Sequence, residues 1–286
     1  METAVVTAIN SLMLSAMYIL VALGFALLFS IAGILNFAHG ALYMLAGYIC
    51  YIVAVEFGIN PWVALAGTII VMGLLGLFLE RFLFRPFWGN LNRTIVTAIA
   101  IIVILETGIN VSLGAGVLKQ IPDFASGLIE TSTFRFSVER LVIFAVSAIL
   151  LAFMVWFITR TKLGLRMQAI AQEREGASLQ GINIYRVAAF TFALGCMLAA
   201  VAGCFMGSLY NLDPFMGELM LLKIVEVVIL GGVGSIAGIL VGGLMLGTID
   251  AVLPQFVSGQ ATQAIALGII ILFLLVRPQG FFGRLV

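Results

Sequence analysis

Charged side chains are scarce in this sequence of 286 residues, and that scarcity decides its class. Only 9% of the residues are charged, whereas soluble domains carry about 25%. Hydrophobic residues make up 63% of the chain, too many to bury in one core surrounded by water. The formal net charge of +1 argues against nucleic acid as a partner. Composition therefore predicts an integral membrane protein in a lipid bilayer.

Residues that could carry chemistry are equally few. A single histidine excludes a zinc site of the HExxH kind, and neither a GxSxG elbow nor a Walker-type phosphate loop is present. The three cysteines (Cys50, Cys196 and Cys204) lie in apolar runs without a CxxC pair, which is typical of small buried hydrophobes. We expect no catalytic residue, metal site, cofactor or disulfide in this chain, and an enzyme is the least favoured class.

Long apolar runs are what the sequence has in abundance. Nine of them lie between charged or breaker-rich connections, at residues 4–29, 38–55, 61–82, 94–113, 141–158, 187–210, 217–230, 233–253 and 262–276. The runs at 38–55 and 217–230 are short, so each is either a full span or a re-entrant or broken helix. We predict an all-α polytopic fold with eight or nine membrane segments, forming a single transmembrane domain over residues 1–286.

The distribution of lysine and arginine predicts the orientation. Alternating nine spans places loops 81–93 and 160–186 and the C-terminal tail on one side, together with most of the basic residues. The opposite side holds only Lys119, Arg135 and Arg140. Because cytoplasmic loops carry the excess of positive charge, we predict a cytoplasmic C-terminus and an N-terminus on the outer face.

Two short motifs share one layout. NFAHG (36–40) and DPFMG (213–217) each follow a long span and open a short one. Asn36 and Asp213 are suitable N-cap residues, and Pro214 suits the first helical position. The motifs lie five spans apart, so their helix starts would face opposite sides of the membrane. An inverted repeat with broken helices has this arrangement, with solute passing near the midplane.

Asn36, Phe37, His39 and Gly40 are the first candidates for a translocation path. Polar groups such as Asn36 and His39 are costly at membrane depth and tend to face the bundle interior or a cavity. The free N–H groups of a helix start could also meet a polar solute there. The alternative is that Asn36 only caps the helix and His39 only bonds a neighbouring carbonyl group.

Lys223 and Glu226 are the second candidates for the path. They are three residues apart, so they share one helical face and can form an ion pair. Such a pair is either structural or part of a gate or substrate contact. Glu106 and Asp250 are isolated acids with no partner visible in the sequence. Proton coupling would need such acids, which keeps a secondary transporter open.

Gly234, Gly238 and Gly242 recur every four residues in the most glycine-dense region of the chain. A helical face of small residues lets two helix backbones approach closely. We expect this face to serve helix packing, either within the chain or against a second membrane subunit.

A polar island, GLRMQAIAQEREGASLQGIN (164–183), interrupts the apolar sequence between the fifth and sixth spans. It carries Arg166, Glu173, Arg174 and Glu175 on the predicted cytoplasmic side. A short amphipathic helix there can present charges for specificity and an apolar face to a groove of a partner. The alternative is a solvated loop with helical propensity.

Four segments in order resemble one family. ILNFAHGALYMLAGY (34–48), the polar island, VEVVILGGVGSIAGILVGG (225–243) and the tail LLVRPQGFFG (274–283) are similar to segments of the permeases of bacterial branched-chain amino acid ABC importers. The resemblance is closer to the first of the two related permease types and covers nearly the whole chain. Importers of urea, amides and other small solutes share this permease type, so the solute is less well specified.

The resemblance implies a heteromeric importer in the bacterial inner membrane. Two homologous permeases would form the path, two cytoplasmic ATPases holding ATP and Mg²⁺ would drive it, and a periplasmic binding protein would deliver the substrate. The coupling segment of the family maps onto the island, and the residues implied in ATPase coupling are Gln172, Glu173, Arg174, Glu175, Gly176, Ala177 and Gly181. The sequence has Glu-Gly-Ala where the stricter family pattern has Glu-Ala-Ala.

We therefore predict a permease for branched-chain or other hydrophobic amino acids, with the island as its cytoplasmic coupling helix. A urea or amide importer of the same type is one alternative. A self-sufficient channel or secondary transporter is another, and it predicts flux through this chain alone in liposomes.

Overall fold

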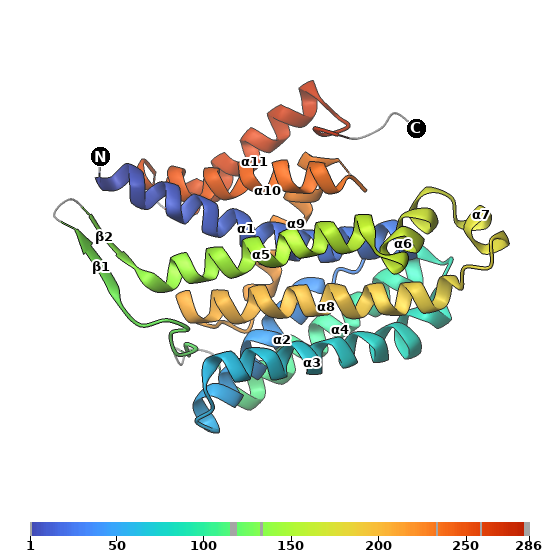
Figure 1. The fold of residues 1–286 in the computed structure, drawn as a ribbon, viewed down its shortest axis with the longest axis horizontal. Coiled ribbons are helices and arrows are strands. Elements are labelled where there is room, and N and C mark those ends of the chain that lie inside the picture. The colour runs from blue at the N-terminus through green and yellow to red at the C-terminus, as the bar shows by residue number, and fades with distance from the viewer. Residues whose placement is uncertain (1, 115–118, 132–133, 233, 258, 283–286) are drawn as a thin grey trace. The chain divides into compact units, whose positions relative to one another are not determined.

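The computed structural model describes residues 2–114, 119–131, 134–232, 234–257 and 259–282, and helices dominate them (Figure 1). The α-helices are α1 (Glu2–Ala32), α2 (His39–Tyr51), α3 (Pro61–Leu79), α4 (Leu91–Leu113), α5 (Val138–Arg160), α6 (Lys162–Gln172), α7 (Arg174–Leu179), α8 (Ile184–Leu209), α9 (Met216–Gly231), α10 (Ile236–Val252) and α11 (Gly259–Val276). Among the described residues, seven helices are long and apolar enough to cross a membrane. The prediction of an all-α polytopic membrane protein is confirmed.

Irregular turns extend three of these helices. A π-helical turn, Ile52–Glu56, continues α2, and the two together are 18 residues long, enough for the segment at 38–55 to span. A π-helical turn and a 3₁₀ turn, Glu80–Phe84 and Arg85–Phe87, continue α3, and a 3₁₀ turn, Leu253–Gln255, follows α10. The other short segment forms α9, which has 16 residues.

The long polar connection before α5 contains a β-hairpin that the sequence analysis did not predict. Strand β1 (Leu128–Thr131) pairs antiparallel with β2 (Phe134–Ser137), with Leu128 opposite Ser137 and Ile129 opposite Phe136. β-Branched and aromatic residues favour a pleated surface, which is why this short stretch is extended.

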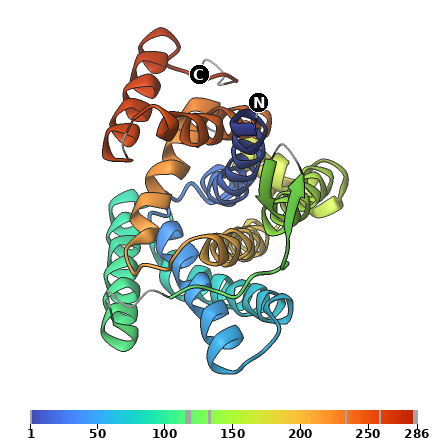
Figure 2. The ribbon, with the colours of Figure 1, turned by 90° about the vertical axis from the view of Figure 1, so that its left-hand side faces the viewer.

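The chain folds into two compact units, each built from separate stretches of sequence. The larger unit comprises residues 23–122 and 153–221, and the smaller unit comprises residues 1–22, 123–152 and 222–286. In the larger unit α8 runs beside α2 and α3 (Figure 2). Glycines allow this close approach, since a Cβ atom at Gly203 of α8 would overlap the carbonyl oxygen of Tyr43 in α2.

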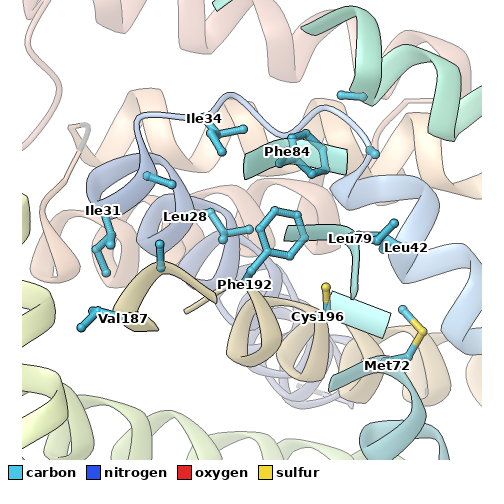
Figure 3. Packing of buried hydrophobic residues seen from close by; sticks show 14 of the residues in the cluster. Leu28, Ile31, Ile34, Leu42, Met72, Leu79, Phe84, Val187, Phe192 and Cys196 are labelled. Atoms are coloured by element: carbon cyan, nitrogen blue, oxygen red, sulfur yellow. The ribbon is translucent and has the colours of Figure 1, made fainter. Parts of the chain in front are cut away.

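A hydrophobic cluster fills the interior of the larger unit (Figure 3). Leu28 of α1, Met72 of α3 and Cys196 of α8 contribute to it and are all buried. The rings of Phe84 and Phe192 pack at its centre, 5.1 Å apart between centroids. Cys50 and Cys204, like Cys196, are free and buried, so the prediction for the three cysteines is confirmed.

In the smaller unit α10 packs against α9 through glycines. A Cβ atom at Gly238 would overlap the carbonyl oxygen of Gly231, and one at Gly242 would lie 2.7 Å from that of Val227. The prediction that Gly234 shares this helical face is wrong. Gly234 has a φ of 85° and precedes α10, whose N-cap is Ser235. Gly231 of α9 contributes the small residue that Gly234 does not.

The C-terminal tail completes the end of α9. The N–H groups of Phe281 and Phe282 donate hydrogen bonds to the carbonyl groups of Leu230 and Gly231, at 2.8 and 3.1 Å. The last carbonyl groups of a helix lack partners within the helix, so the tail supplies them. The end of the tail motif, from residue 283 on, lies outside the described residues.

Candidate functional site

The turn between α1 and α2 holds the first group of predicted path residues. Gly33, with a φ of 65°, follows the end of α1, and the chain then passes through Asn36 to the start of α2 at His39. Asn36 and His39 are fully buried. The side-chain nitrogen and oxygen of Asn36 have no hydrogen-bond partner among the described residues. An unsatisfied buried amide is costly, so its position indicates a place where a polar group can bind.

The predicted capping role of Asn36 is wrong. Ala38 is the N-cap residue of α2, and no side chain caps that helix. The backbone carbonyl of Asn36, rather than its side chain, accepts a hydrogen bond, from the N–H of His39 at 3.0 Å. The imidazole of His39 lies edge-on to Phe25 at 6.1 Å between ring centroids, and Phe37 packs against the hydrophobic cluster. Of these residues, Asn36 therefore has the side chain best placed to meet a solute.

The two motifs with the same sequence layout meet in the larger unit. Gly40 is the second residue of α2, and Gly217 is the second residue of α9. A Cβ atom at Gly217 would lie 2.6 Å from the carbonyl oxygen of Gly40, and one at Gly40 would overlap that of Gly217. Asp213 does cap its turn, since its carboxylate accepts a hydrogen bond from the N–H of Phe215 at 2.8 Å. Pro214 lies in this turn, ahead of the first residue of α9.

Lys223 lies at the centre of a charged cluster in the smaller unit. Its ammonium group is 2.9 Å from a carboxylate oxygen of Asp250 and 3.5 Å from one of Glu226. The hydroxyl of Tyr18 donates a hydrogen bond to Asp250 at 2.8 Å. The expected pair of Lys223 and Glu226 is present, but Asp250 is the nearer partner. Asp250, which has no partner visible in the sequence, is therefore not isolated. The side-chain oxygen Oε1 of Glu106, in the larger unit, has no hydrogen-bond partner among the described residues.

The polar island forms two helices instead of one. Thr161 caps α6 by accepting a hydrogen bond from the N–H of Gly164 at 3.1 Å. Glu173 then adopts an extended conformation, with φ −152° and ψ 107°, and separates α6 from α7. Gly181, with a φ of 77°, lies in the turn after α7. The predicted coupling residues therefore lie on α7 and at its two ends.

The two faces of α7 differ sharply. Ala177 is buried and belongs to the hydrophobic cluster of the larger unit. Gln172, Glu173 and Glu175 are exposed. Leu179, one turn after Glu175, is 86% exposed, although it is a large apolar side chain. The exposed face of the helix thus combines a carboxylate with an unburied leucine, which is the composition of a surface that binds a partner.

Arg174 points inward and ties α7 to α1. Its guanidinium group lies over the ring of Trp88, 4.8 Å from the centroid. The same group is 3.4 Å from the carbonyl oxygens of Ile31 and Ala32, the last residues of α1. A cation beside the C-terminal carbonyl groups of a helix is favourable, because those groups carry the negative end of the helix dipole.

Further side chains extend this contact into a stack that we call the arginine–aromatic stack (Arg85, Tyr185, Trp88 and Arg174). The rings of Trp88 and Tyr185 are stacked, with centroids 5.1 Å apart and an angle of 23° between their planes. Arg85 lies over the other end, 5.4 Å from the centroid of Tyr185. The fully buried carboxylate of Glu80 holds Arg85 through two hydrogen bonds, of 2.7 and 3.1 Å. The island is thus linked to the ends of α1, α3 and α8.

Comparison with known proteins places the whole chain in one family. Residues 7–275 match the model described as the branched-chain amino acid transport system / permease component. The chain belongs to this permease family. The high-affinity branched-chain amino acid transport system permease protein BraD of Pseudomonas aeruginosa is 33% identical, over 96% of this permease and 94% of BraD. The LivH permease proteins of Salmonella typhimurium and Escherichia coli are 32% and 31% identical over the same shares. No solved structure matches the permease significantly.

The structure divides the six predicted path residues of the permease between its two units. Asn36, Phe37, His39 and Gly40 lie in the larger unit, and Lys223 and Glu226 lie in the smaller one. The sequence analysis missed Trp88, Tyr185 and Glu80, which surround the inward-facing Arg174 or hold its stack in place. Their signal in the sequence was weak: aromatic residues beside the breaker Pro86 and at the start of a span resemble ordinary interfacial anchors.

Proposed function

We propose that this permease is one membrane subunit of an ATP-driven importer of branched-chain amino acids in the bacterial inner membrane. Membership of the family and relatives that are named for this transport support the assignment. Its partners are a second homologous permease, two cytoplasmic ATPase subunits and a periplasmic substrate-binding protein. ATP and Mg²⁺ belong to the ATPases, and the permease has no enzymatic activity of its own.

The orientation follows from the basic residues. The island and the end of α3 carry most of them, including Arg81, Arg85, Arg166 and Arg174, and we place this end of the molecule in the cytoplasm. The N-terminus then lies on the periplasmic side and the C-terminus on the cytoplasmic side. This orientation exposes the outer face of α7 to cytoplasmic ATPases.

The contact of Arg174 with the end of α1 is the observation that carries the mechanism. Glu175 and Leu179 form the outer, ATPase-facing surface of α7, whereas Arg174 reaches inward to the carbonyl groups of Ile31 and Ala32. Movement of α7 by the ATPases would displace the end of α1, which lies just before the turn that contains Asn36. Helix ends of this kind can shift as rigid elements between discrete arrangements. The island would thus act on the candidate path through one arginine.

The test separates binding from coupling in the complete importer, reconstituted in proteoliposomes with both permeases, the ATPases and the binding protein. Glu175→Arg should abolish co-purification of the ATPases, because it reverses a charge on the outer face. Arg174→Gln should leave co-purification intact but reduce leucine uptake per ATP hydrolysed. The matched control is Arg93→Glu, which reverses an exposed charge outside the island and should change neither measurement.

Two results would overturn the proposal. Unchanged ATPase association in Glu175→Arg would remove α7 as the coupling surface. Leucine flux through this permease alone in liposomes, without ATPases, would favour a channel or secondary transporter. Uptake of urea or an amide, with a binding protein that ignores leucine, would keep the importer class and change its solute.

A further inference from the structure

A groove opens on the larger unit where the end of α3 meets the start of α8. Its volume is about 640 Å³, and its lining includes Leu77, Arg81, Arg85, Arg186 and Phe190. All of these residues belong to the larger unit. The groove lies beside the arginine–aromatic stack, but most of its lining takes no part in that stack.

The positive charges of the groove are not balanced within the described structure. Arg85 is neutralised by Glu80 at 2.7 Å. Arg81 and Arg186 are exposed and have no acidic partner among the described residues. The groove therefore keeps two unpaired guanidinium groups, which favour an anion, and the planar guanidinium group suits phosphate oxygens in particular.

The apolar part of the groove lies deeper along the same two helices. Leu77 precedes Arg81 by four residues on α3 and its π-helical turn, and Phe190 follows Arg186 by four residues on α8. Residues four apart lie one turn apart on one helical face, and here each apolar residue lies toward the middle of its span. Leu77 and Phe190 are 39% and 41% exposed. The order from the helix ends inward is cation first and apolar surface second.

This order matches the anatomy of a phospholipid at a bilayer surface. We propose that the groove binds an anionic phospholipid, with its phosphate between Arg81 and Arg186 and an acyl chain against Leu77 and Phe190. Basic pockets between membrane helices bind anionic headgroups in this way. The site requires only that α3 and α8 end at a membrane surface, so it stands independently of the transported solute and of the ATPase partners.

Native mass spectrometry of the purified permease in detergent tests the site directly. Titration with phosphatidylglycerol should give a retained one-to-one complex, and phosphatidylcholine should be retained about tenfold more weakly or worse. The variant Arg81→Gln/Arg186→Gln should lose this preference. Arg81→Lys/Arg186→Lys should keep much of it, because the charge remains. The matched control, Arg93→Gln/Arg160→Gln, removes two exposed arginines outside the groove and should bind like the native protein.

Thermal unfolding in detergent supplies the second readout, so that a misfolded variant is not mistaken for loss of binding. The glutamine variant should unfold at the native temperature without lipid but should no longer be stabilised by phosphatidylglycerol. Equal loss in the control pair would overturn the site, because the preference would then reflect general surface charge. Displacement of the lipid by excess inorganic phosphate would indicate a free-anion site and would also overturn it. Loss of binding to a second permease with lipid retention unchanged would show that a subunit fills the groove.

Discussion

Gly40 and Gly217 lie backbone to backbone at the starts of two helices, with room for no side chain on either. A Cβ atom at Gly217 would lie 2.6 Å from the carbonyl oxygen of Gly40. These glycines occupy the same place in the two motifs NFAHG and DPFMG, which are far apart in the sequence. The contact explains why both motifs end in glycine, and it joins the start of α9 to the turn that contains Asn36.

Replacing Gly40 with alanine should therefore destabilise the permease. The added methyl group overlaps backbone atoms that cannot rotate away, and overpacking of this kind costs about 1–3 kcal/mol. Gly67→Ala is the matched control, because Gly67 is also in a helix but has no atom within 4 Å of an added Cβ. Thermal unfolding in detergent should show a lower midpoint for Gly40→Ala and an unchanged or higher midpoint for Gly67→Ala. Equal midpoints would show that the two helix starts are not in contact.

Asn36→Leu should separate transport from stability. The asparagine amide is buried without a hydrogen-bond partner, so an apolar side chain of similar size should change the free energy of unfolding by no more than about 1 kcal/mol, or even raise it. Uptake by the reconstituted importer should fall, because a polar contact for the solute is lost. A large loss of thermal stability with uptake retained would show that Asn36 is a structural residue.

The charged cluster in the smaller unit should respond in a non-additive way. Lys223→Met leaves Asp250 and Glu226 without their cation, and removing one partner from a buried ion pair costs about 3–5 kcal/mol. Adding Asp250→Asn to the same chain should restore part of this loss, because one uncompensated charge disappears. Unfolding of the two single variants and the double variant gives the coupling energy from a double-mutant cycle. Additive effects would argue against the ion pair.

Trp88→Leu should loosen α7 while leaving the spans intact. It removes the stacking on Tyr185 and the ring beneath Arg174, and a desolvated cation–π contact alone is worth about 2 kcal/mol. Limited proteolysis should cut the segment 172–181 faster in this variant. Trp156→Leu provides the control, because Trp156 is 54% exposed on α5 and should not affect cleavage of the island. Unchanged cleavage in both variants would remove the stack as the anchor of α7.

The sequence by itself determined the class of the protein, the approximate ends of its helices and the position of its polar island. Within a bilayer a segment must satisfy its own backbone hydrogen bonds, so a long apolar run has to become a helix whatever surrounds it. Breakers such as Gly33 and Pro61 then lie at helix boundaries for local reasons.

Only the tertiary structure decided what individual side chains do. It turned Arg174 inward and left Leu179 outside, although both belong to one short helix. It gave Asp250 its partners Lys223 and Tyr18 and left the amide of Asn36 without one. These outcomes depend on which helices pack together, and the packing is set by contacts between residues far apart in the chain, which no local pattern of hydrophobicity encodes.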